Sequence, residues 1–458
     1  MPIQKEAEVV VIGAGLTGMT LAHNLRKRNV DFLVLERSGT LGGVINTVEK
    51  NGFIYETGPN TGVLGNEFVM DLFDELAGYC KLEVAGNSVN KRYIVKNGRM
   101  EPMPAGLISG ITTPLFSFGD KLRILGEPFR RPGTKPNETL DQLVIRRMGK
   151  SFLNYAVDPF ILGVYAGDPS YLVPKYALPK LYNLEQKYGS FIGGHIKMAR
   201  EKKKSGIVTR ANRKIFSVEG GLANLTKALY NSAGNEKFII STNGIEVQPV
   251  IEGYVVKGII NNEEVSIKAK KVVTTIGAHE LPRVVPFIEG AVLNSISNLL
   301  YARVVQVSLG FKKWQGHTID SFGGLIPFRE NRDILGILFP SAFLKNRAPE
   351  GGALLSVFLG GVRKSHIFDL SDTEIQDIVK KEVSQLMGLK EFHPDLFHIS
   401  RYHHAIPQYG ADCEARFKAV ETIQEKYKGL YIAGNLRNGI GMADRIKQGF
   451  ELLGELGF

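Results

Sequence analysis

The stretch Val9-Val10-Val11-Ile12-Gly13-Ala14-Gly15-Leu16-Thr17-Gly18 combines four apolar residues with three glycines in the order GxGxxG. The apolar run predicts a buried strand, and the apolar positions within residues 17–28 predict a helix. Gly13 permits a tight turn, Gly15 lets the backbone approach a pyrophosphate, and Gly18 permits close packing of the helix on the strand. The N-terminus of the helix offers unpaired N–H groups to the phosphates. The stretch therefore predicts an α/β fold that begins with a β-α-β unit.

An acidic residue follows at the spacing that a nucleotide site requires. Residues 32–35 (FLVL) predict the second strand, and Glu36 ends it, eighteen residues after Gly18. A carboxylate at this position accepts hydrogen bonds from a ribose diol. Strand, glycines, helix, second strand and acid occur in the required order, which favours a dinucleotide site over a turn that merely needs glycines.

Further glycine-rich segments indicate which dinucleotide is bound. Gly42 and Gly43 follow Glu36-Arg37 closely, and an NAD site does not need this second pair. The pair resembles the extended signature of one FAD-binding class. Gly58-Pro59 comes next, and near the C-terminus the strand-like run 430–433 leads into Gly434-Asn435. A last helix, residues 442–456, begins after Gly441, and its N-terminus would stabilise negative charge on the N1–C2 edge of a reduced flavin. Together these segments predict FAD.

Length and composition exclude several classes of protein. A chain of 458 residues, 43% hydrophobic and 22% charged, is typical of a globular protein of two or three domains. Cys80 and Cys413 form neither a CxxC nor a metal-binding cluster, so we expect no disulfide framework, no metal site and a reducing compartment. The short polar N-terminus leaves no room for a signal peptide. Residues 102–119 carry no charge, but prolines and glycines break them, so we expect a loop or short helix that lines a pocket or rests on a membrane.

Positive charge is concentrated in the middle of the chain. Residues 87–214 hold 23 Lys and Arg against nine Asp and Glu, whereas the whole chain has 57 and 46. A solvated surface, an anionic lipid surface and an anionic substrate are all compatible with this excess. No helix-turn-helix, RNA-binding or zinc pattern accompanies it, so we expect no nucleic acid partner. The densest run includes Lys202, Lys203 and Lys204.

The remaining sequence divides by texture. Helical patterns dominate residues 120–130, 137–160 and 175–204, and further helices are predicted over 67–80, 222–233 and 373–387. Short β-like runs separated by turn signals occupy 238–276. Strands of a second sheet are predicted over 303–311, 322–328, 334–339 and 353–359.

At this point the sequence resembles the amine-oxidase-type flavoproteins, and among them the branch of the protoporphyrinogen oxidases. The resemblance rests on GAGLTG (13–18), ETGPN (56–60) and YIAGN (431–435), and on three more specific segments: NKRYIVKNG (90–98), GVYAGDP (163–169) and FSVEGGLANLT (216–226). It runs over nearly the whole chain. It implies a Rossmann-type FAD-binding domain, a mixed-sheet substrate domain and an inserted helical membrane-docking domain.

The resemblance also implies domain boundaries. The FAD-binding domain is expected in three parts, 1–86, 214–279 and 405–458. The helical insert is expected over 87–213, and the substrate domain over 280–404. The basic, helical middle region and the β-like pattern near residue 300 both agree with this division.

Site residues follow from the motifs and the resemblance together. The expected FAD contacts are Gly13, Gly15, Leu16, Thr17, Gly18, Glu36, Arg37, Gly42, Gly43, Gly58, Pro59, Val247, Gly434, Asn435, Gly441, Met442 and Ala443. The resemblance places Arg92 opposite a substrate propionate, which a guanidinium binds bidentately. It places the backbone carbonyl of Gly167 near the substrate, and Leu325, Leu338 and Phe358 in the lining of the pocket. Asn46 stands where certain relatives carry arginine, so the contact that this position makes with the cofactor is left unassigned.

The implied activity is an oxygen-dependent oxidation at CH–CH groups in haem biosynthesis. Protoporphyrinogen IX would lose six hydrogens in three hydride transfers to flavin N5 and become protoporphyrin IX. Positioning and exclusion of water would supply most of the catalysis. His195, His403 and His404 are candidates for a base, but nothing in the sequence assigns one, and no catalytic side chain is predicted.

Alternatives stay open at this level. Coproporphyrinogen III, a tetracarboxylate, requires more cationic groups than Arg92 alone. An amine oxidase or carotenoid desaturase of the same superfamily is a second alternative, and a non-catalytic flavin- or NAD-binding regulator on a membrane is a third. Cys413 lies 21 residues before Gly434, which does not support a covalent flavin, so non-covalent FAD is expected.

Partners and location follow from the same reasoning. We expect a porphyrinogen, O₂ or another electron acceptor, and an anionic membrane surface on the cytoplasmic side, with no transmembrane helix. The resemblance also admits a homodimer and a ferrochelatase that receives the product.

Overall fold

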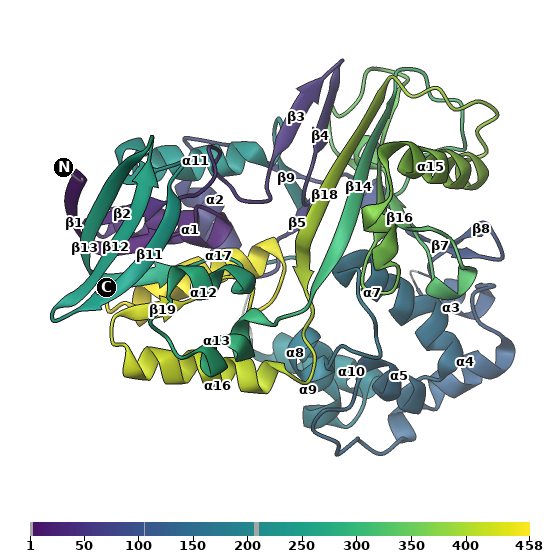
Figure 1. Ribbon diagram of the computed structural model, residues 1–458. Coiled ribbons are helices and arrows are strands. Elements are labelled where there is room, and N and C mark those ends of the chain that lie inside the picture. Colours follow the sequence, from purple (N-terminus) through teal and green to yellow (C-terminus); the bar gives the residue numbers. More distant parts are fainter. Residues whose placement is uncertain (1–2, 105, 206–209) are drawn as a thin grey trace.

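Two seven-stranded sheets form the framework of the protein in the computed structural model, which describes residues 3–104, 106–205 and 210–458 (Figure 1). The first sheet has the order β10-β2-β1-β13-β12-β11, with β19 beside β13. Its strands are β10 (Phe238–Ile239), β2 (Phe32–Leu35), β1 (Ile3–Ile12), β13 (Glu263–Thr274), β12 (Gly253–Ile260), β11 (Asn243–Val250) and β19 (Leu430–Ile432).

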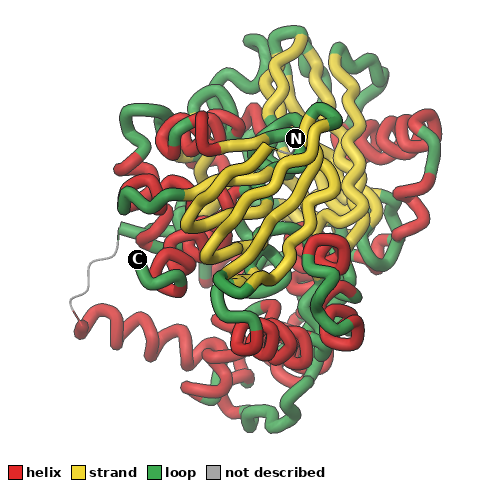
Figure 2. The backbone as a smooth tube through the Cα atoms, turned by 60° about the vertical axis from the view of Figure 1, so that its left-hand side comes forward, coloured by secondary structure: helices red, strands yellow, loops and turns green. Residues whose placement is uncertain are grey.

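Strand β13 takes part in both the antiparallel and the parallel portion of the first sheet. Its first part pairs antiparallel with β12, which in turn pairs antiparallel with β11, whereas Val272–Thr274 pair parallel with β19. From Val265 to Thr274, β13 runs parallel to β1. Strand β1 was expected to begin at Val9; it begins at Ile3, because residues 3–7 extend the ladder along the first part of β13. Figure 2 shows these strands toward the viewer.

Helices cover one face of the parallel strands, and the antiparallel meander β11–β12–β13, together with further helices, covers the other. One face packs on α1 (Leu16–Lys27), α11 (Ala223–Ala233) and α17 (Met442–Glu455), with Val9, Val11 and Val34 in that core. Val10, Ile12 and Leu35 point the other way. They meet side chains of β11–β13 and of three helices, α12 (Leu281–Val284), α13 (Gly290–Ser297) and α16 (Cys413–Lys426). Burial on both faces explains why these strands are apolar without alternation.

The second sheet has the order β18-β14-β17-β16-β15-β7-β8. Its strands are β18 (Leu396–Pro407), β14 (Tyr301–Phe311), β17 (Ala353–Gly360), β16 (Ile334–Leu338), β15 (Gly323–Leu325), β7 (Tyr93–Lys96) and β8 (Arg99–Pro102). One face, with Val305, Val307 and Leu309, packs on α15 (Asp372–Met387). The other face carries Gln306, Ser308 and Ser356. It faces residues 56–60, which Gln306 and Ser356 contact by hydrogen bonds.

Two small sheets and two short helices complete this part of the chain. The hairpin of β3 (Thr47–Lys50) and β4 (Phe53–Glu56) forms a two-stranded sheet of its own. In the other small sheet, β9 (Ile215–Val218) lies between β5 (Gly62–Val63) and β6 (Leu82–Val84). The helices are α2 (Glu67–Glu75) and α14 (Pro340–Phe343).

The helical part of the chain is more broken than its pattern predicts. Its helices are α3 (Leu107–Thr112), α4 (Phe118–Leu125), α5 (Leu140–Arg147), α6 (Lys150–Phe152), a π-helical turn (Leu153–Val157), α7 (Asp158–Tyr165), α8 (Pro174–Ala177), α9 (Pro179–Tyr188) and α10 (Phe191–Ser205). Residues 137–160 are mostly helical, as their pattern predicts, but they form several helices, because Gly149 has a φ of +96° just after α5; Gly189, at +75°, separates α9 from α10. Among the described residues, no helix is both long and apolar enough to cross a bilayer.

The division into domains stays a prediction, and two segments pack across its boundaries. The hairpin β7–β8, inside the expected helical insert, extends the second sheet because β7 runs parallel to β15. Helices α12 and α13, inside the expected substrate domain, pack in the core of the first sheet.

A buried ionic network holds the helical part together. Arg147 and Glu127 are both fully buried and form a direct ion pair, and Glu185 lies 3.2 Å from the guanidinium of Arg147. Glu127 also accepts hydrogen bonds from Ser190 Oγ (2.7 Å) and from the N–H of Phe191 (2.9 Å). The network joins α5, α9, α10 and the turn after α4.

We expect Arg147→Met to lower the free energy of unfolding by about 3–5 kcal/mol, because the fully buried carboxylate of Glu127 would lose its counter-ion, whereas Glu185 would keep Arg146. Lys187→Met is the control: Lys187 pairs with Glu201 at 3.6 Å on the surface, where a pair contributes about 0–1 kcal/mol. Urea unfolding of both variants is the measurement. Equal midpoints would show that the network contributes no more than a surface pair.

Candidate cofactor and substrate site

The turn between β1 and α1 has the geometry that the glycines predict. Gly13 has a φ of +103°, and Gly15 precedes the first residue of α1. A Cβ atom on Gly18 would lie 2.1 Å from the carbonyl oxygen of Gly13, so only glycine permits this contact of helix and strand. A Cβ atom on Gly15 would meet nothing within 4 Å. The turn therefore leaves open space beside Gly15, in front of the N-terminus of α1, where Leu16 and Thr17 begin the helix.

Glu36 is fixed beside this turn. One carboxylate oxygen accepts the N–H of Ala14 at 2.7 Å, and the other accepts the N–H of Ser38 at 2.8 Å. Each oxygen keeps a second lone pair for a hydroxyl group. Arg37 points elsewhere, because its guanidinium pairs with Glu280 at 2.9 Å and its side chain is more than half exposed.

The second glycine pair packs on the first turn. The N–H of Gly42 donates to the carbonyl of Ala14 at 2.8 Å, and Gly42 forms a bridge with Gly15. Gly42 and Gly43 have φ angles of +100° and +62°, which side chains rarely adopt. A Cβ atom on Gly43 would lie 3.3 Å from the Cα atom of Gly15. The two glycine motifs thus build one cradle.

The segment around Gly58-Pro59 lies between the two halves of the protein. A Cβ atom on Gly58 would lie 1.9 Å from the carbonyl oxygen of Val44. The hydroxyl of Tyr402, on β18, donates to the carbonyl of Thr57 at 2.5 Å. Asn46, left open by the sequence, donates from Nδ2 to the Thr57 hydroxyl at 3.1 Å. The segment is therefore clamped from both sides.

The C-terminal motifs arrive at the same edge of the first sheet. Strand β19 lies beside β13 and delivers Gly434, at a φ of +98°, and Asn435. Gly441 caps α17, and the Asp444 carboxylate accepts its N–H at 3.1 Å. Met442 is buried, and the carbonyl of Ala443 accepts a hydrogen bond from Asn66 at 3.0 Å. Helices α17 and α1 pack together, so both of their first turns belong to one region (Figure 1).

Val247 differs from the other predicted cofactor residues. It lies on β11, at the edge of the meander, and its side chain is fully buried in the core between the meander and the parallel strands. Any contact from Val247 to a nucleotide would therefore be made by its backbone.

The predicted pocket residues of the second sheet share one face. Leu325, Gly336 and Phe358 lie opposite one another across β15, β16 and β17, and Gln306 continues the row on β14. Leu338, two residues after Gly336, has the same orientation. Leu325, Leu338 and Phe358 are each only partly buried. A Cβ atom on Gly163 would lie 2.4 Å from Leu325 Cδ2, so α7 packs against the end of this row.

The same face is tied to the cofactor half by polar groups. Gln306 Nε2 donates to the carbonyl of Glu56 at 2.8 Å, and Ser356 Oγ donates to Asn60 Oδ1 at 2.8 Å. Glu56 and Asn60 flank Gly58-Pro59, so the apolar row begins next to the segment that is expected to hold the cofactor.

Arg92 and Gly167 lie at different places around this face. Arg92 precedes β7; its side chain is exposed and lies over the ring of Phe322, with 5.3 Å to the ring centre. Gly167 follows α7, and a Cβ atom there would lie 2.3 Å from Gln408 Oε1. Gln408 is fully buried and donates to the carbonyl of Tyr165 at 2.9 Å.

The histidines considered as bases occupy other surroundings. His404 stacks on His279 with ring centres 3.6 Å apart, and burial lowers the pKa of both imidazoles. His403 lies against Phe368, and His195 is exposed on α10. None of these contacts involves the predicted pocket residues.

Sequence reasoning missed the side chains that organise the C-terminal loop. Gln448 Oε1 accepts the N–H of Gly434 at 3.0 Å, and the Tyr409 hydroxyl lies 2.7 Å from the carbonyl of Asn435. Arg445 is buried and donates to the carbonyl of Gly439 at 2.9 Å. The sequence signal that could have identified these side chains is the group of polar residues Asp444, Arg445 and Gln448 on the predicted last helix.

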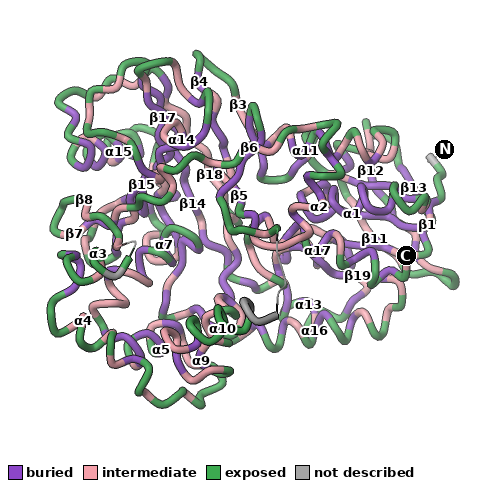
Figure 3. Tube along the Cα trace, turned by 180° about the vertical axis from the view of Figure 1, so that it is seen from behind, coloured by how far each residue is buried: buried purple, intermediate pink, exposed green. Residues whose placement is uncertain are grey.

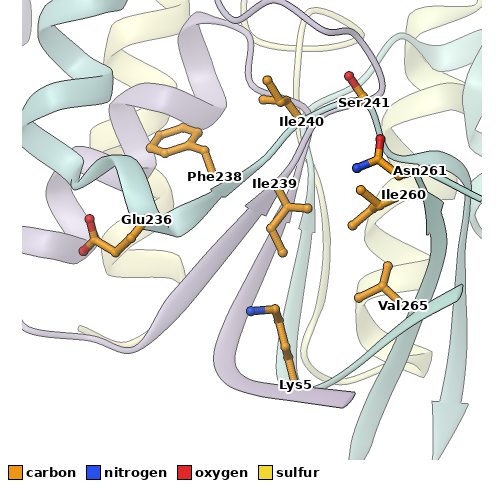
Figure 4. A pocket seen from close by; sticks show the side chains of 9 residues that line it. All are labelled: Lys5, Glu236, Phe238, Ile239, Ile240, Ser241, Ile260, Asn261 and Val265. Carbon is orange, nitrogen blue, oxygen red and sulfur yellow. The ribbon is translucent and has the colours of Figure 1, made fainter. Parts of the chain in front are cut away.

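A separate depression of about 460 Å³ lies at the edge of the first sheet (Figure 4). Lys5, Glu236, Phe238, Ile239, Ile240, Ser241, Ile260, Asn261 and Val265 line it. None of them is a predicted site residue, and five of the nine are apolar.

The residues of the cradle fit a dinucleotide. The space beside Gly15, the hydroxyl-accepting carboxylate of Glu36 and the first turns of α1 and α17 are the groups that a pyrophosphate, a ribose and a flavin edge require.

Comparisons with known proteins place the chain in a family. A family model described as flavin containing amine oxidoreductase matches residues 16–448. The mitochondrial protoporphyrinogen oxidase of Nicotiana tabacum is 29% identical, with 96% of this chain and 93% of that protein covered. The coproporphyrinogen III oxidase of Bacillus subtilis is 27% identical, with 96% of each chain covered.

Solved structures support the fold. A candidate protoporphyrinogen oxidase from Exiguobacterium sp. superposes with a TM-score of 0.82 at 21% identity, over 99% of this chain and 98% of that one. A reduced UDP-galactopyranose mutase superposes with a TM-score of 0.72 at 15% identity, over 98% and 96%. The predicted α/β fold, with a Rossmann-type FAD-binding part and a mixed-sheet part, is confirmed.

Two glycine variants separate folding from cofactor binding. Gly15→Ala places a methyl group in open space, so we expect an unchanged melting temperature without FAD and an FAD dissociation constant at least about tenfold higher, which is about 1.4 kcal/mol. Gly18→Ala drives a methyl group into the Gly13 carbonyl, so we expect the protein itself to melt earlier. Thermal melts and absorbance titration with FAD measure both effects. Full FAD affinity in Gly15→Ala would contradict a pyrophosphate at this turn.

Proposed function

The chain belongs to the flavin-containing amine oxidoreductase family, whose members are FAD-dependent oxidoreductases, and on this premise we propose that it oxidises a porphyrinogen to a porphyrin. The substrate we favour is protoporphyrinogen IX, with protoporphyrin IX as the product. The observation that carries this proposal is the apolar row of Leu325, Leu338 and Phe358, which begins beside Gly58-Pro59 and has Arg92 near its edge. A flexible, largely apolar macrocycle with carboxylates at its rim fits such a surface.

The chemistry divides simply between cofactor and protein. When bound, FAD supplies a two-electron acceptor at N5, and O₂ is the acceptor we propose for its reoxidation. Oxidation to the porphyrin removes six hydrogens in three such steps. The task of the chain is to hold a meso carbon of the macrocycle against the flavin and to exclude water. Phe358 offers a ring for stacking on a pyrrole, and α7 closes the row at Leu325.

Coproporphyrinogen III is the second candidate, and a specific observation favours keeping it. The tobacco and Bacillus relatives are nearly equally identical to this chain, at 29% and 27%, and their names differ in the porphyrinogen. A tetracarboxylate would need further cations at the rim. Lys91, the neighbour of Arg92, is already paired with Asp320, which favours the dicarboxylate.

The direct test is anaerobic reduction of the bound flavin. We expect stoichiometric protoporphyrinogen IX to bleach the flavin absorbance, and O₂ to restore it with the appearance of protoporphyrin fluorescence. The same assay with coproporphyrinogen III ranks the two substrates by kcat/KM. A flavin that stays oxidised with both compounds would refute the enzyme assignment and leave a binding role.

Arg92→Gln tests the carboxylate contact. A charged hydrogen bond contributes about 1.5–3 kcal/mol, so we expect KM for protoporphyrinogen IX to rise at least about tenfold with little change in kcat. Arg99→Gln is the matched control, because Arg99 is exposed at the far end of the same hairpin. An unchanged KM in Arg92→Gln would remove Arg92 from the substrate site.

We also propose that the helical part docks on an anionic membrane surface. Six large apolar side chains are exposed on and beside α3 and α4: Ile108, Ile111, Phe118, Leu122, Leu125 and Phe129. Helix α4 has no buried residue, and Figure 3 shows it and α3 as largely exposed. Exposed apolar residues so close together indicate an interaction surface. The exposed basic residues Arg123 and Arg131 flank this apolar patch; the side chains of Lys202, Lys203 and Lys204 lie outside what the structure describes.

The apolar patch makes a separate prediction. Phe118→Glu combined with Phe129→Glu removes two side chains that would each contribute about 1.5–3 kcal/mol on burial, so we expect more than a tenfold loss of binding to vesicles of phosphatidylcholine and phosphatidylglycerol. Ile251→Glu is the control, since Ile251 is fully exposed on the β11–β12 turn, far from the apolar patch. Sedimentation with vesicles measures the binding. Equal losses in both proteins would contradict docking at the apolar patch.

A further inference from the structure

The last helix carries a buried positive charge that the protein does not neutralise. Arg445, in the first turn of α17, is only 9% exposed. Its guanidinium donates to the carbonyl oxygens of Arg437 (2.9 Å), Asn438 (3.0 Å) and Gly439 (2.9 Å). It also donates to Gln448 Oε1 at 2.7 Å, and its Nε has no hydrogen-bond partner. In the described part of the chain, no carboxylate lies within ion-pair distance of it.

This placement is electrostatically unfavourable in the protein alone. The N-terminus of a helix is its positive end, so a cation in the first turn is repelled. A buried charge without a counter-ion is destabilising even where neutral groups solvate it. Asp444 is adjacent, but its carboxylate accepts the N–H of Gly441. Burial lowers the pKa of Arg445, yet an arginine stays charged at neutral pH.

Arg445 lies at the centre of the segments expected to hold the cofactor. Its backbone carbonyl accepts the hydroxyl of Thr17 at 3.3 Å, in the first turn of α1. Its partner Gln448 accepts the N–H of Gly434 at 3.0 Å. The carbonyl of Gly439, which it holds, also lies 3.0 Å from the Tyr409 hydroxyl. Arg445 thus contacts α1 through its backbone carbonyl and the loop that leads into α17 through its side chain. Its partner Gln448 extends these contacts to the Gly434 turn.

We propose that Arg445 is a positioning residue for FAD, which holds the loop 437–441 in place and keeps a buried positive charge near the pyrimidine edge of the flavin. Two-electron reduction adds negative charge to that edge, and a cation in a low-dielectric site stabilises it. Arg445 therefore raises the reduction potential of the bound flavin. The inference depends on FAD and on the orientation of α17 toward the flavin, and not on the porphyrinogen.

The sharpest variant is Gln448→Glu. It places a carboxylate where an amide oxygen already accepts from Arg445 and Gly434, and the amide nitrogen that it removes has no partner. The loop keeps its hydrogen bonds, whereas the charge of Arg445 is neutralised. Arg445→Gln removes the charge directly, and Arg445→Lys keeps it without the planar fork. Lys447→Gln is the control, because Lys447 is an exposed cation on the same helix.

The experiment measures the reduction potential of the FAD-loaded proteins against reference dyes, without porphyrinogen. For Gln448→Glu and Arg445→Gln we expect the equilibrium constant of reduction to fall at least about tenfold, which is about 30 mV for a two-electron couple. Arg445→Lys should retain most of the wild-type potential, and Lys447→Gln all of it, because water and salt screen an exposed charge.

Two outcomes would overturn the proposal. One is a wild-type potential in FAD-loaded Gln448→Glu, which would show that the charge of Arg445 does not reach the flavin. The other is an equal fall in Arg445→Lys and Arg445→Gln with no fall in Gln448→Glu, which would assign Arg445 to loop structure alone. If Arg445→Gln does not retain FAD, Gln448→Glu and Arg445→Lys decide. Because no substrate is present, a failed porphyrinogen assay has no bearing on the result.

Discussion

Parallel pairing of β13 with β1 on one side and β19 on the other is the constraint on which the site depends. These ladders place Ile12 next to Thr274, and Thr274 next to Ile432. Each strand ends at the same edge of the sheet, so the turns that follow, at Gly13, Thr275 and Gly434, lie side by side. The Thr275 hydroxyl donates to the carbonyl of Gly13 at 2.9 Å, and a Cβ atom on Gly434 would lie 3.0 Å from the carbonyl of Ile276. Segments more than 400 residues apart in the chain thereby form one cradle.

A second constraint orients the two halves of the molecule. The face of the second sheet that carries Gln306 is polar where it meets residues 56–60. It is apolar along the row of Leu325, Leu338 and Phe358. Gln306, Ser356 and Tyr402 bond the segment from Glu56 to Asn60. Such buried polar groups are costly unless every partner is met, so they favour one relative placement of the halves. The apolar row of Leu325, Leu338 and Phe358 follows them on the same face, and it is the surface proposed above for the substrate.

Two of the buried arginines, Arg147 and Arg445, have different surroundings. Arg147 is paired with the carboxylates of Glu127 and Glu185. Arg445 is surrounded by carbonyl oxygens of a glycine-rich loop. The first cation has carboxylate partners within the protein, whereas the second has only neutral oxygens as partners among the described residues. This difference is the basis of the role proposed for Arg445.

The sequence by itself determined the local elements of the cofactor site: the strand, the glycine turn, α1 and Glu36 are where their spacing predicts, because each depends on neighbouring residues. The last helix and most strands of the second sheet follow for the same reason. Tertiary structure decided what local pattern cannot express. Gly149 and Gly189 divide the helical part because their backbones are left-handed there, and the hairpin after Arg92 extends the second sheet because β15 offers it an edge. The surroundings of Arg445 and Gln448 emerge only when α17 packs against α1, since burial and partners are properties of the packed chain and not of its order.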